Sequence, residues 1–346
     1  MCLCAIWLAW GSVRATGTND YLLGVAATET QDQQAAAAPQ KSESLVTVLV
    51  AFGANLLIAV AKTVAGVMTG SASMVAEAAH SWADAGNEIF LLVADRRSAR
   101  GRDRNHPMGY GREAYVWSMF AAFGLFSAGA IVSIWHGITE LRDPEPATDY
   151  VIAYVVLGVA FVLEGVSFLQ ALRQTRKTAA SLDRRPIWHI LNTSNPTLRA
   201  VFFEDAAALT GLVLAGLGVG LHQFTGSPVP DAVGSICVGV LLGVVAVLLI
   251  DRNRRFLVGE SVDDVVRAEV LADLQARPDV DRVTYLHLEY VGPSRVYLVA
   301  AIDMTGNESE SGLAVRLRKV ERELELNENI EEAVLTLATP DEPSLS

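Results

Sequence analysis

Residues 74–88, MVAEAAHSWADAGNE, decide how the fold of this chain is interpreted. In a helix, His80 and Asp84 lie one turn apart on the same face, and Glu77 and Asn87 extend that face in either direction. Ionisable groups deep inside a membrane-spanning helix each cost roughly 2.5–3.5 kcal/mol or more, so they usually line a pathway or face the interior of a helix bundle. The simpler alternative is a His–Asp hydrogen bond that holds helices together.

This stretch lies in one of six apolar segments, each about 20 residues long, which is the length that an α-helix needs to cross a bilayer. Hydrophobic residues make up 51% of the chain, and its mean hydropathy is +0.31. Six buried core helices of a soluble protein would fit this pattern poorly. We therefore expect an α-helical membrane protein, with a bundle of six transmembrane helices over residues 45–68, 74–94, 114–138, 152–172, 200–221 and 232–250.

The fifth apolar segment contains a second polar group, Phe203-Glu204-Asp205-Ala206. Two adjacent carboxylates repel each other in an apolar span unless a cation or a proton neutralises them. One imidazole and two or three carboxylate oxygens suit tetrahedral zinc, with ligand distances of about 2.0–2.2 Å, and carboxylates also suit manganese. These residues predict a metal site formed by His80, Asp84, Glu204 and Asp205.

Basic residues are concentrated in alternate connections between the apolar segments. Arginines are dense in residues 95–113, and further basic residues follow the fourth and sixth segments, whereas the connection after the third segment is the acidic RDPEPATD. Positive residues stay on the cytoplasmic side of a membrane. We therefore expect both ends of the chain in the cytoplasm, and the plasma (inner) membrane as the location.

Composition divides the chain into three expected parts. Residues 1–43 are expected to be an N-terminal leader that is disordered or results from an early start codon, and residues 44–257 form the six-helix domain. Residues 258–346 are typical of a cytoplasmic α/β domain, in which αββαβ order predicts a ferredoxin-like sheet with helices on one face. Its expected elements are a helix at 262–276, strands at 283–290 and 296–304, a helix at 312–326 and a strand at 333–338.

The last of these parts is acidic and carries most of the formal net charge of −12. After Val258 there are 19 acidic and 8 basic residues, which argues against nucleic acid as a partner. A domain of this size is marginally stable alone, so we expect it to pack against a second copy in a homodimer. The three cysteines, Cys2, Cys4 and Cys237, indicate no thiolate metal site, and we expect no prosthetic group.

Several motifs in the chain resemble the cation diffusion facilitator family of six-helix zinc transporters. Residues 74–84 are similar to the family's second-helix signature, in which His-x-x-x-Asp supplies two metal ligands. Residues 106–113, HPMGYGRE, resemble the family's HPxGxGxxR loop, and Pro230-Asp231 opens the sixth helix as it usually does there. The resemblance runs from about residue 44 through the tail. It implies efflux of a divalent metal across a lipid bilayer, and hence a transporter rather than an enzyme.

The chain departs from the family pattern on the fifth helix, where a second His-x-x-x-Asp is usual. Glu204 stands at the histidine position and Ala208 at the aspartate position, so Asp205 is the candidate to replace the missing ligand. Adjacent helical residues point about 100° apart, so both acids reach one ion only if the helix is distorted or water intervenes. An acidic pair here resembles the subgroup that contains the mitochondrial zinc exporter of animals, which favours zinc.

Other polar residues receive narrower predictions. Asp103 and His106 match a loop metal site of some relatives, but Tyr110 stands where a further histidine would be, so we expect His106 to shape the loop. The tail has only His287, which predicts a dimerisation domain without a zinc cluster.

Glu164, an isolated acid in the fourth segment, is a candidate for proton or ion movement. Two further polar residues, Asn55 and Asp231, are expected to form hydrogen bonds between helices, although both could also line the path.

A metal ligand must lose its proton to bind, so metal and protons compete for the same groups. This competition favours a metal:proton antiporter with alternating access, which carries Zn²⁺, or Mn²⁺, Fe²⁺ or Co²⁺, out of the cytoplasm. A membrane metal sensor that binds the ion without moving it is the alternative from another class, because fold does not fix function. A membrane hydrolase is disfavoured, since no serine or cysteine near the acidic helices has the setting of a nucleophile.

Overall fold

The computed structural model describes residues 45–144, 149–181 and 185–345, so the leader predicted for residues 1–43 lies outside the described residues. The described residues form two compact units. One unit comprises residues 45–95 and 115–254 and is helical, whereas the other comprises residues 96–114 and 255–345 and contains a sheet.

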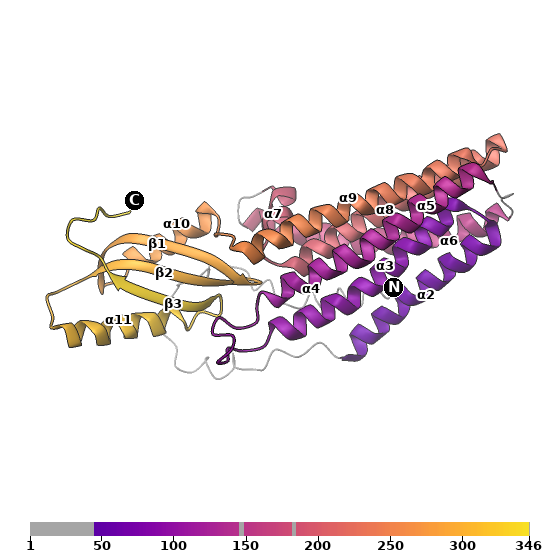
Figure 1. The fold of residues 1–346 in the computed structure, drawn as a ribbon. Helices are drawn as coiled ribbons and strands as arrows, with labels where there is room; N and C mark the ends of the chain where they lie inside the picture. The colour runs from indigo at the N-terminus through magenta and orange to yellow at the C-terminus, as the bar shows by residue number, and fades with distance from the viewer. Residues whose placement is uncertain (1–44, 145–148, 182–184, 346) are drawn as a thin grey trace. The chain divides into compact units, whose positions relative to one another are not determined.

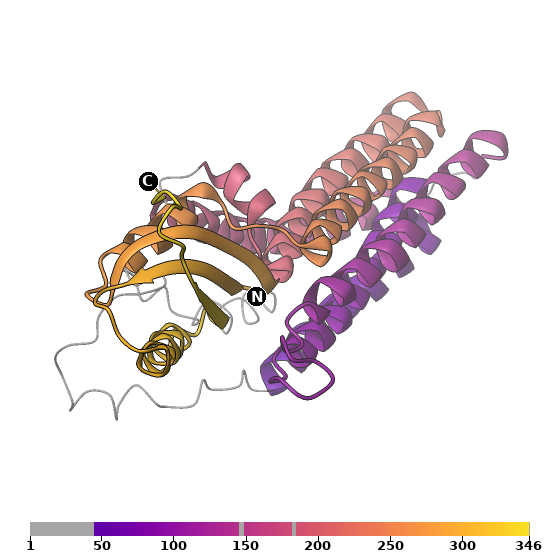
Figure 2. The same cartoon turned by 60° about the vertical axis from the view of Figure 1, so that its left-hand side comes forward.

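Long helices make up the first unit, and Figure 1 and Figure 2 show them running alongside one another. Within the part of the chain that the structure describes, four helical stretches are long and apolar enough to cross a membrane: Glu113–Arg142, Tyr150–Lys177, Pro196–Thr225 and Val229–Val258. The other two predicted spans are also helices, but buried polar groups interrupt the apolar sequence of one of them. The bounds are α2 Leu45–Thr69, α3 Ala72–Ser98, α4 Glu113–Ala121, η1 Ala122–Phe126, α5 Ser127–Arg142, α6 Tyr150–Ser181, α7 Pro186–Asn192, α8 Pro196–Thr225 and α9 Val229–Val258.

The short helix α7 and the early start of α8 were not expected from the sequence. Pro186 begins α7, at a position where the missing N–H costs no helical hydrogen bond. Asn195 precedes α8, and its side chain accepts hydrogen bonds from the backbone N–H groups of Thr197 and Leu198 at 3.1 and 3.0 Å. Because this cap satisfies two otherwise unpaired donors, α8 begins at Pro196, before the apolar segment itself.

The third long helix contains a π-helical turn, η1, between α4 and α5. Nothing in the sequence pattern predicts this turn, and such turns are rare and frequently occur at functional sites. Leu125 in η1 packs against Gly86 of α3, where an added Cβ would lie 2.8 Å from Leu125 Cδ1. The widened turn therefore contacts α3 two residues from Asp84.

The second unit contains the predicted αββαβ order. Strands β1 (Val280–Gly292) and β2 (Arg295–Met304) are antiparallel, with Leu288 opposite Leu298, and β3 (Ile330–Leu337) is parallel to β2. The strand order is β1-β2-β3. Helices α10 (Asp264–Gln275) and α11 (Glu310–Leu324) flank the strand pair in the chain. The three-stranded sheet thus agrees with the predicted element order, with strands slightly longer than expected.

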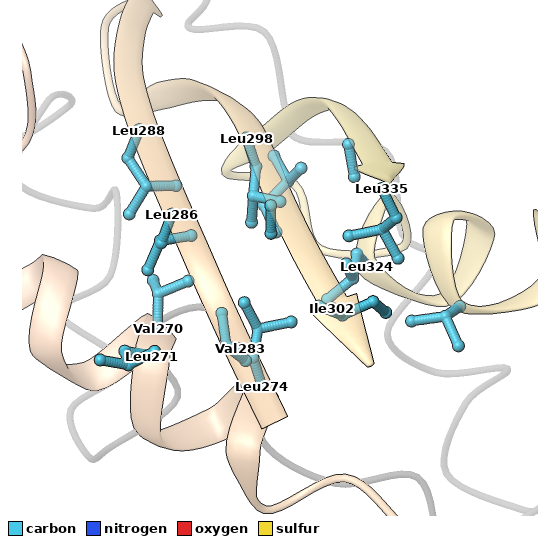
Figure 3. Close-up of a cluster of buried hydrophobic side chains, with 14 of the residues drawn as sticks. Val270, Leu271, Leu274, Val283, Leu286, Leu288, Leu298, Ile302, Leu324 and Leu335 are labelled. Atoms are coloured by element: carbon cyan, nitrogen blue, oxygen red, sulfur yellow. The ribbon is translucent and has the colours of Figure 1, made fainter. Parts of the chain in front are cut away.

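A hydrophobic core forms between this sheet and its two helices. Every second residue of β2 from Val296 to Met304 is buried, which is the alternation expected of a strand with one face covered. Figure 3 shows side chains from α10 and from α11 meeting side chains of the strands. The core residues that it labels are Val270, Leu271, Leu274, Val283, Leu286, Leu288, Leu298, Ile302, Leu324 and Leu335.

Residues 96–114, which contain the connection between α3 and α4, belong to this second unit. Gly111 lies so close to the β1–β2 turn that an added Cβ would be 2.8 Å from Gly292 Cα. Arg102 Nε lies 2.8 Å from Glu331 Oε1. Glycine at position 111 is therefore needed for this connection to reach the sheet, because any side chain would collide with backbone atoms.

Candidate metal-binding site

The first part of the candidate site comes from α3 alone. His80 Nε2 lies 3.2 Å from Asp84 Oδ2, and the His80 side chain is completely buried. Neither imidazole nitrogen, nor Asp84 Oδ1, has a hydrogen-bond partner within the described part of the chain. Because both residues belong to one helix, their contact cannot hold two helices together. The pair instead leaves buried nitrogen and oxygen atoms available to bind a metal ion.

Glu204 brings α8 to the same place. Asn87 Nδ2 of α3 donates a hydrogen bond of 2.6 Å to Glu204 Oε2. Asn87 follows Asp84 by three residues on α3, so Glu204 lies beside the turn of α3 that carries Asp84. The structure therefore pairs His80 with Asp84 and places Glu204 of α8 beside the same part of α3.

The fourth predicted ligand, Asp205, is turned toward a different helix. Ser167 Oγ of α6 donates a hydrogen bond of 2.8 Å to Asp205 Oδ2. Helix α8 is continuous here, so the two neighbouring acids point in different directions, as helical geometry requires. Among the described residues, no three His, Cys, Asp or Glu side chains already surround a common position for a metal ion. Side chains must therefore rotate before all four residues can reach one ion.

A buried ion pair beside this site was missed by the sequence reasoning. Lys62 Nζ of α2 lies 3.0 Å from Glu77 Oε2 of α3, and both side chains are completely inaccessible. Glu77 was placed on the face of the site, but its partner was not recognised. The available signal was that Lys62 is the sole charged residue of the apolar segment 45–68.

The remaining polar residues of the bundle mostly connect helices. Asn55 donates a hydrogen bond to Glu88, and Asp231 accepts hydrogen bonds from the Ala72 and Ser73 N–H groups at 2.8 and 3.3 Å. These contacts confirm the predicted hydrogen bonds between helices. Asp231 additionally caps the first turn of α3 from α9, which fixes the helix that carries His80 and Asp84.

Glu164 of α6 is another buried acid of the bundle. It is 8% exposed, and its charge interacts with those of Lys62, Asp84 and Asp205. It remains a candidate for ion or proton movement, as expected from its isolation in an apolar segment.

In the connection between α3 and α4, the carboxyl group of Asp103 accepts hydrogen bonds that hold the local backbone in place. Its Oδ1 accepts from the N–H groups of Asn105 and His106 at 2.8 and 2.7 Å, and its Oδ2 accepts from the Tyr110 hydroxyl at 2.7 Å. The rings of His106 and Tyr110 stack with centroids 4.0 Å apart. This geometry agrees with a role for His106 in loop structure.

Long apolar helices with ionisable groups buried at a contact between two of them define an integral membrane protein of the ion-transporting class. The family model of the cation efflux transmembrane domain matches residues 48–258. The chain therefore belongs to the cation efflux family, which confirms the predicted resemblance to cation diffusion facilitators.

Relatives from several organisms match the chain. Metal tolerance protein C4 of Arabidopsis thaliana is 37% identical over 233 residues, which are 67% of this chain and 51% of the relative. The mitochondrial proton-coupled zinc antiporter SLC30A9 of Xenopus laevis is 37% identical over 261 residues, 75% of this chain and 46% of the relative. The cation-efflux pump FieF of Escherichia coli is 25% identical over 248 residues, 70% of this chain and 75% of the pump. The chain thus spans about half the length of the first two relatives, and the second confirms the predicted resemblance to the subgroup of the mitochondrial zinc exporter.

Proposed function

We propose that this chain exports a divalent metal, zinc in the first place, in exchange for protons. The observation that carries the proposal is the buried His80–Asp84 pair on α3, next to which Asn87 of the same helix holds the buried carboxyl group of Glu204 from α8. Membership of the cation efflux family supports the direction and the class of cargo. The printed name of the Xenopus laevis relative, a proton-coupled zinc antiporter, supports both the metal and the coupling ion.

In this proposal, His80, Asp84 and Glu204 are direct metal ligands. One imidazole nitrogen and two carboxylate groups suit zinc, which prefers four ligands in tetrahedral arrangement. Asp205 supplies the fourth position after turning away from Ser167, or it orients a water molecule that fills that position. Manganese, iron and cobalt are alternative cargoes for the same acidic ligand set.

Proton coupling follows from the neighbouring carboxyl groups of Asp84 and Glu204. Two adjacent carboxylates in apolar surroundings need a proton or a cation between them. A metal ion that binds both groups displaces that proton, and a proton that returns from the other side of the membrane weakens metal binding. The same atoms therefore bind the two ions alternately, so export of one requires movement of the other in the opposite direction.

We further propose six membrane spans in residues 44–257, with α2 and α3 added to the four long apolar helices. The polar groups of α3 are compatible with a span because they are buried against other helices rather than exposed to lipid. Alternating access then moves helices around the site, and the irregular turn η1, which contacts α3 beside Asp84, is a suitable point for such movement.

We assign residues 258–346 to a cytoplasmic ferredoxin-like domain that joins two copies of the chain, because the helices leave one face of its sheet for a partner. Both ends of the chain are placed on the cytoplasmic side by the arginine-rich connections. The plasma (inner) membrane expected from the sequence finds no support in the relatives' names, one of which places its protein in the mitochondrion.

Zinc accumulation in sealed vesicles tests the proposed function. The purified full-length chain is reconstituted, a proton gradient is imposed, and zinc uptake is measured with manganese, iron and cobalt as competitors. We expect zinc uptake that depends on the proton gradient and that persists when manganese, iron or cobalt is present at the same concentration as zinc. A metal sensor would bind zinc at the membrane without accumulating it inside the vesicles, so binding without uptake would favour that alternative.

A further inference from the structure

Lys62 and Glu77 form a polar pair that the proposed ligand set does not use. The two side chains are completely buried, and Nζ of Lys62 lies 3.0 Å from Oε2 of Glu77. A charged pair is costly to remove from water, and a buried pair often contributes little to stability. Because the pair lies beside the proposed metal site, we expect its charges to influence the binding of the metal ion.

This pair lies on the same helix contact as the proposed ligands. Glu77 precedes Asp84 by seven residues on α3, and Gly211 follows Glu204 by seven residues on α8, a displacement of about 10 Å along each helix. Glu77 Oε1 packs against Gly211, where an added Cβ would lie only 2.5 Å away. The α3–α8 contact thus continues from the ligands to the ion pair, and Glu77 fits there because residue 211 has no side chain.

The acidic groups around this contact outnumber the cations that face them. Five residues with carboxyl side chains are each less than 10% exposed, namely Glu77, Asp84, Glu164, Glu204 and Asp205. The Lys62 charge interacts with three of these groups, those of Glu77, Glu164 and Asp84. Arg199, another fully buried cation, instead donates hydrogen bonds to the Thr193 carbonyl and to Asn253 Oδ1. Within the described residues, Lys62 is therefore the cation that acts on the acidic cluster.

We propose that Lys62 is a positioned charge that tunes metal affinity, a tethered cation that limits how tightly the metal is held. The inference rests on the proposed function and names a residue outside its ligand set. A fixed positive charge near the site repels a divalent ion, and this repulsion is strong where water is excluded. Without that charge, a bound divalent ion meets less repulsion, so the metal binds more tightly and its release becomes slower.

Zinc affinity of the purified full-length chain, measured by calorimetry with zinc ions alone, tests this role. Lys62→Met removes the charge at nearly constant volume, and we expect at least about tenfold tighter zinc binding. Glu77→Gln changes the charge in the opposite direction and should weaken binding. The double variant Lys62→Met/Glu77→Gln has the net charge of the wild type, and its zinc affinity should be close to that of the wild type. Lys62→Arg keeps the positive charge and should also bind zinc with nearly wild-type affinity.

Transport in vesicles adds a second readout. Lys62→Met should lower both KM and kcat for zinc, because tighter binding also slows release, whereas a purely structural role would lower the rate without lowering KM. If Lys62→Met does not fold, Lys62→Gln, which keeps a hydrogen-bond donor for Glu77, must bind zinc more tightly than the wild type. A folded variant without the charge that binds zinc no more tightly overturns the role of Lys62, whatever its rate. A wild type that neither binds nor transports zinc overturns the proposed function and this inference with it.

Discussion

Asn87 Nδ2 on α3 donates a hydrogen bond of 2.6 Å to Glu204 Oε2 on α8, within the buried interior of the bundle. The two residues belong to apolar segments that are more than 100 positions apart in the sequence. Their contact brings Glu204 to the level of Asp84 and orients its carboxyl group. Asn87 is thus a positioning residue for the proposed site, because it acts on the metal through Glu204.

Replacement of Asn87 by alanine should weaken zinc binding by about 10- to 100-fold, the range typical of residues that orient a metal ligand. The loss arises because Glu204 is no longer held toward His80 and Asp84. Calorimetric titration of the purified protein with zinc measures the effect. Asn307→Ala, in an exposed loop of the second unit, is the matched control and should leave affinity unchanged. Equal affinities of Asn87→Ala and Asn307→Ala would contradict the positioning role.

Asp231 should stabilise the bundle through the cap that it forms on α3. Asp231→Ala leaves the buried N–H groups of Ala72 and Ser73 without an acceptor, which costs about 1–3 kcal/mol. We expect a lower midpoint of thermal unfolding, with a smaller decrease for Asp231→Asn, which keeps one acceptor oxygen. Asp143→Ala, at an exposed position, is the control. The same midpoint in Asp231→Ala and the control would show that the cap is unimportant.

Gly111 and Gly101 provide a matched pair within one connection. An added Cβ at Gly111 would lie 2.6 Å from the Val291 carbonyl oxygen, whereas nothing lies within 4 Å of one added at Gly101. Gly111→Ala should therefore displace residues 96–114 from the sheet, lower the unfolding midpoint and accelerate proteolysis of this segment. Gly101→Ala should change neither quantity. Comparable proteolysis of the two variants would argue against the close contact with Gly292.

The stability of the folded conformation of residues 96–114 should depend on pH, because Asp103 in this segment titrates. Hydrogen bonds from the Tyr110 hydroxyl and from the His106 and Asn105 N–H groups hold the pKa of Asp103 below its usual value. A depressed pKa in the folded state means that this stabilisation is complete above the usual aspartate pKa and is lost as pH falls through the folded value. Tyr110→Phe should raise the pKa of Asp103, which a carboxyl NMR titration would detect. An identical titration in both proteins would rule out the hydroxyl as the main cause.

Segment length and apolar composition were sufficient to predict the four long apolar helices that the described residues contain, because a bilayer imposes both properties. Helix spacing likewise placed His80 and Asp84 on one face. The direction of Asp205 could not be predicted, since it depends on how α8 is rotated against α6, where Ser167 lies. The role of Lys62 could not be predicted, because its ion-pair partner, Glu77, belongs to another helix.

The π-helical turn and α7 show a different limit of sequence reasoning. The residues of η1 continue an apolar segment without interruption, so hydrophobic pattern alone cannot distinguish a π-helical turn from a regular α-helix. Helix α7 depends on Pro186 and on packing of Ile190, which is fully buried. Local irregularities of this kind follow from packing between helices, which composition and periodicity do not specify.

Zinc-driven proton flux in vesicles that contain the full-length chain tests metal:proton exchange at the His80–Asp84–Glu204 site most directly. A zinc gradient should drive protons in the opposite direction in the wild type. The flux should be abolished by His80→Ala and by Glu204→Ala, and reduced less by Asp205→Asn, because Asp205 faces α6. Unchanged proton flux in both His80→Ala and Glu204→Ala would contradict the assignment of the site.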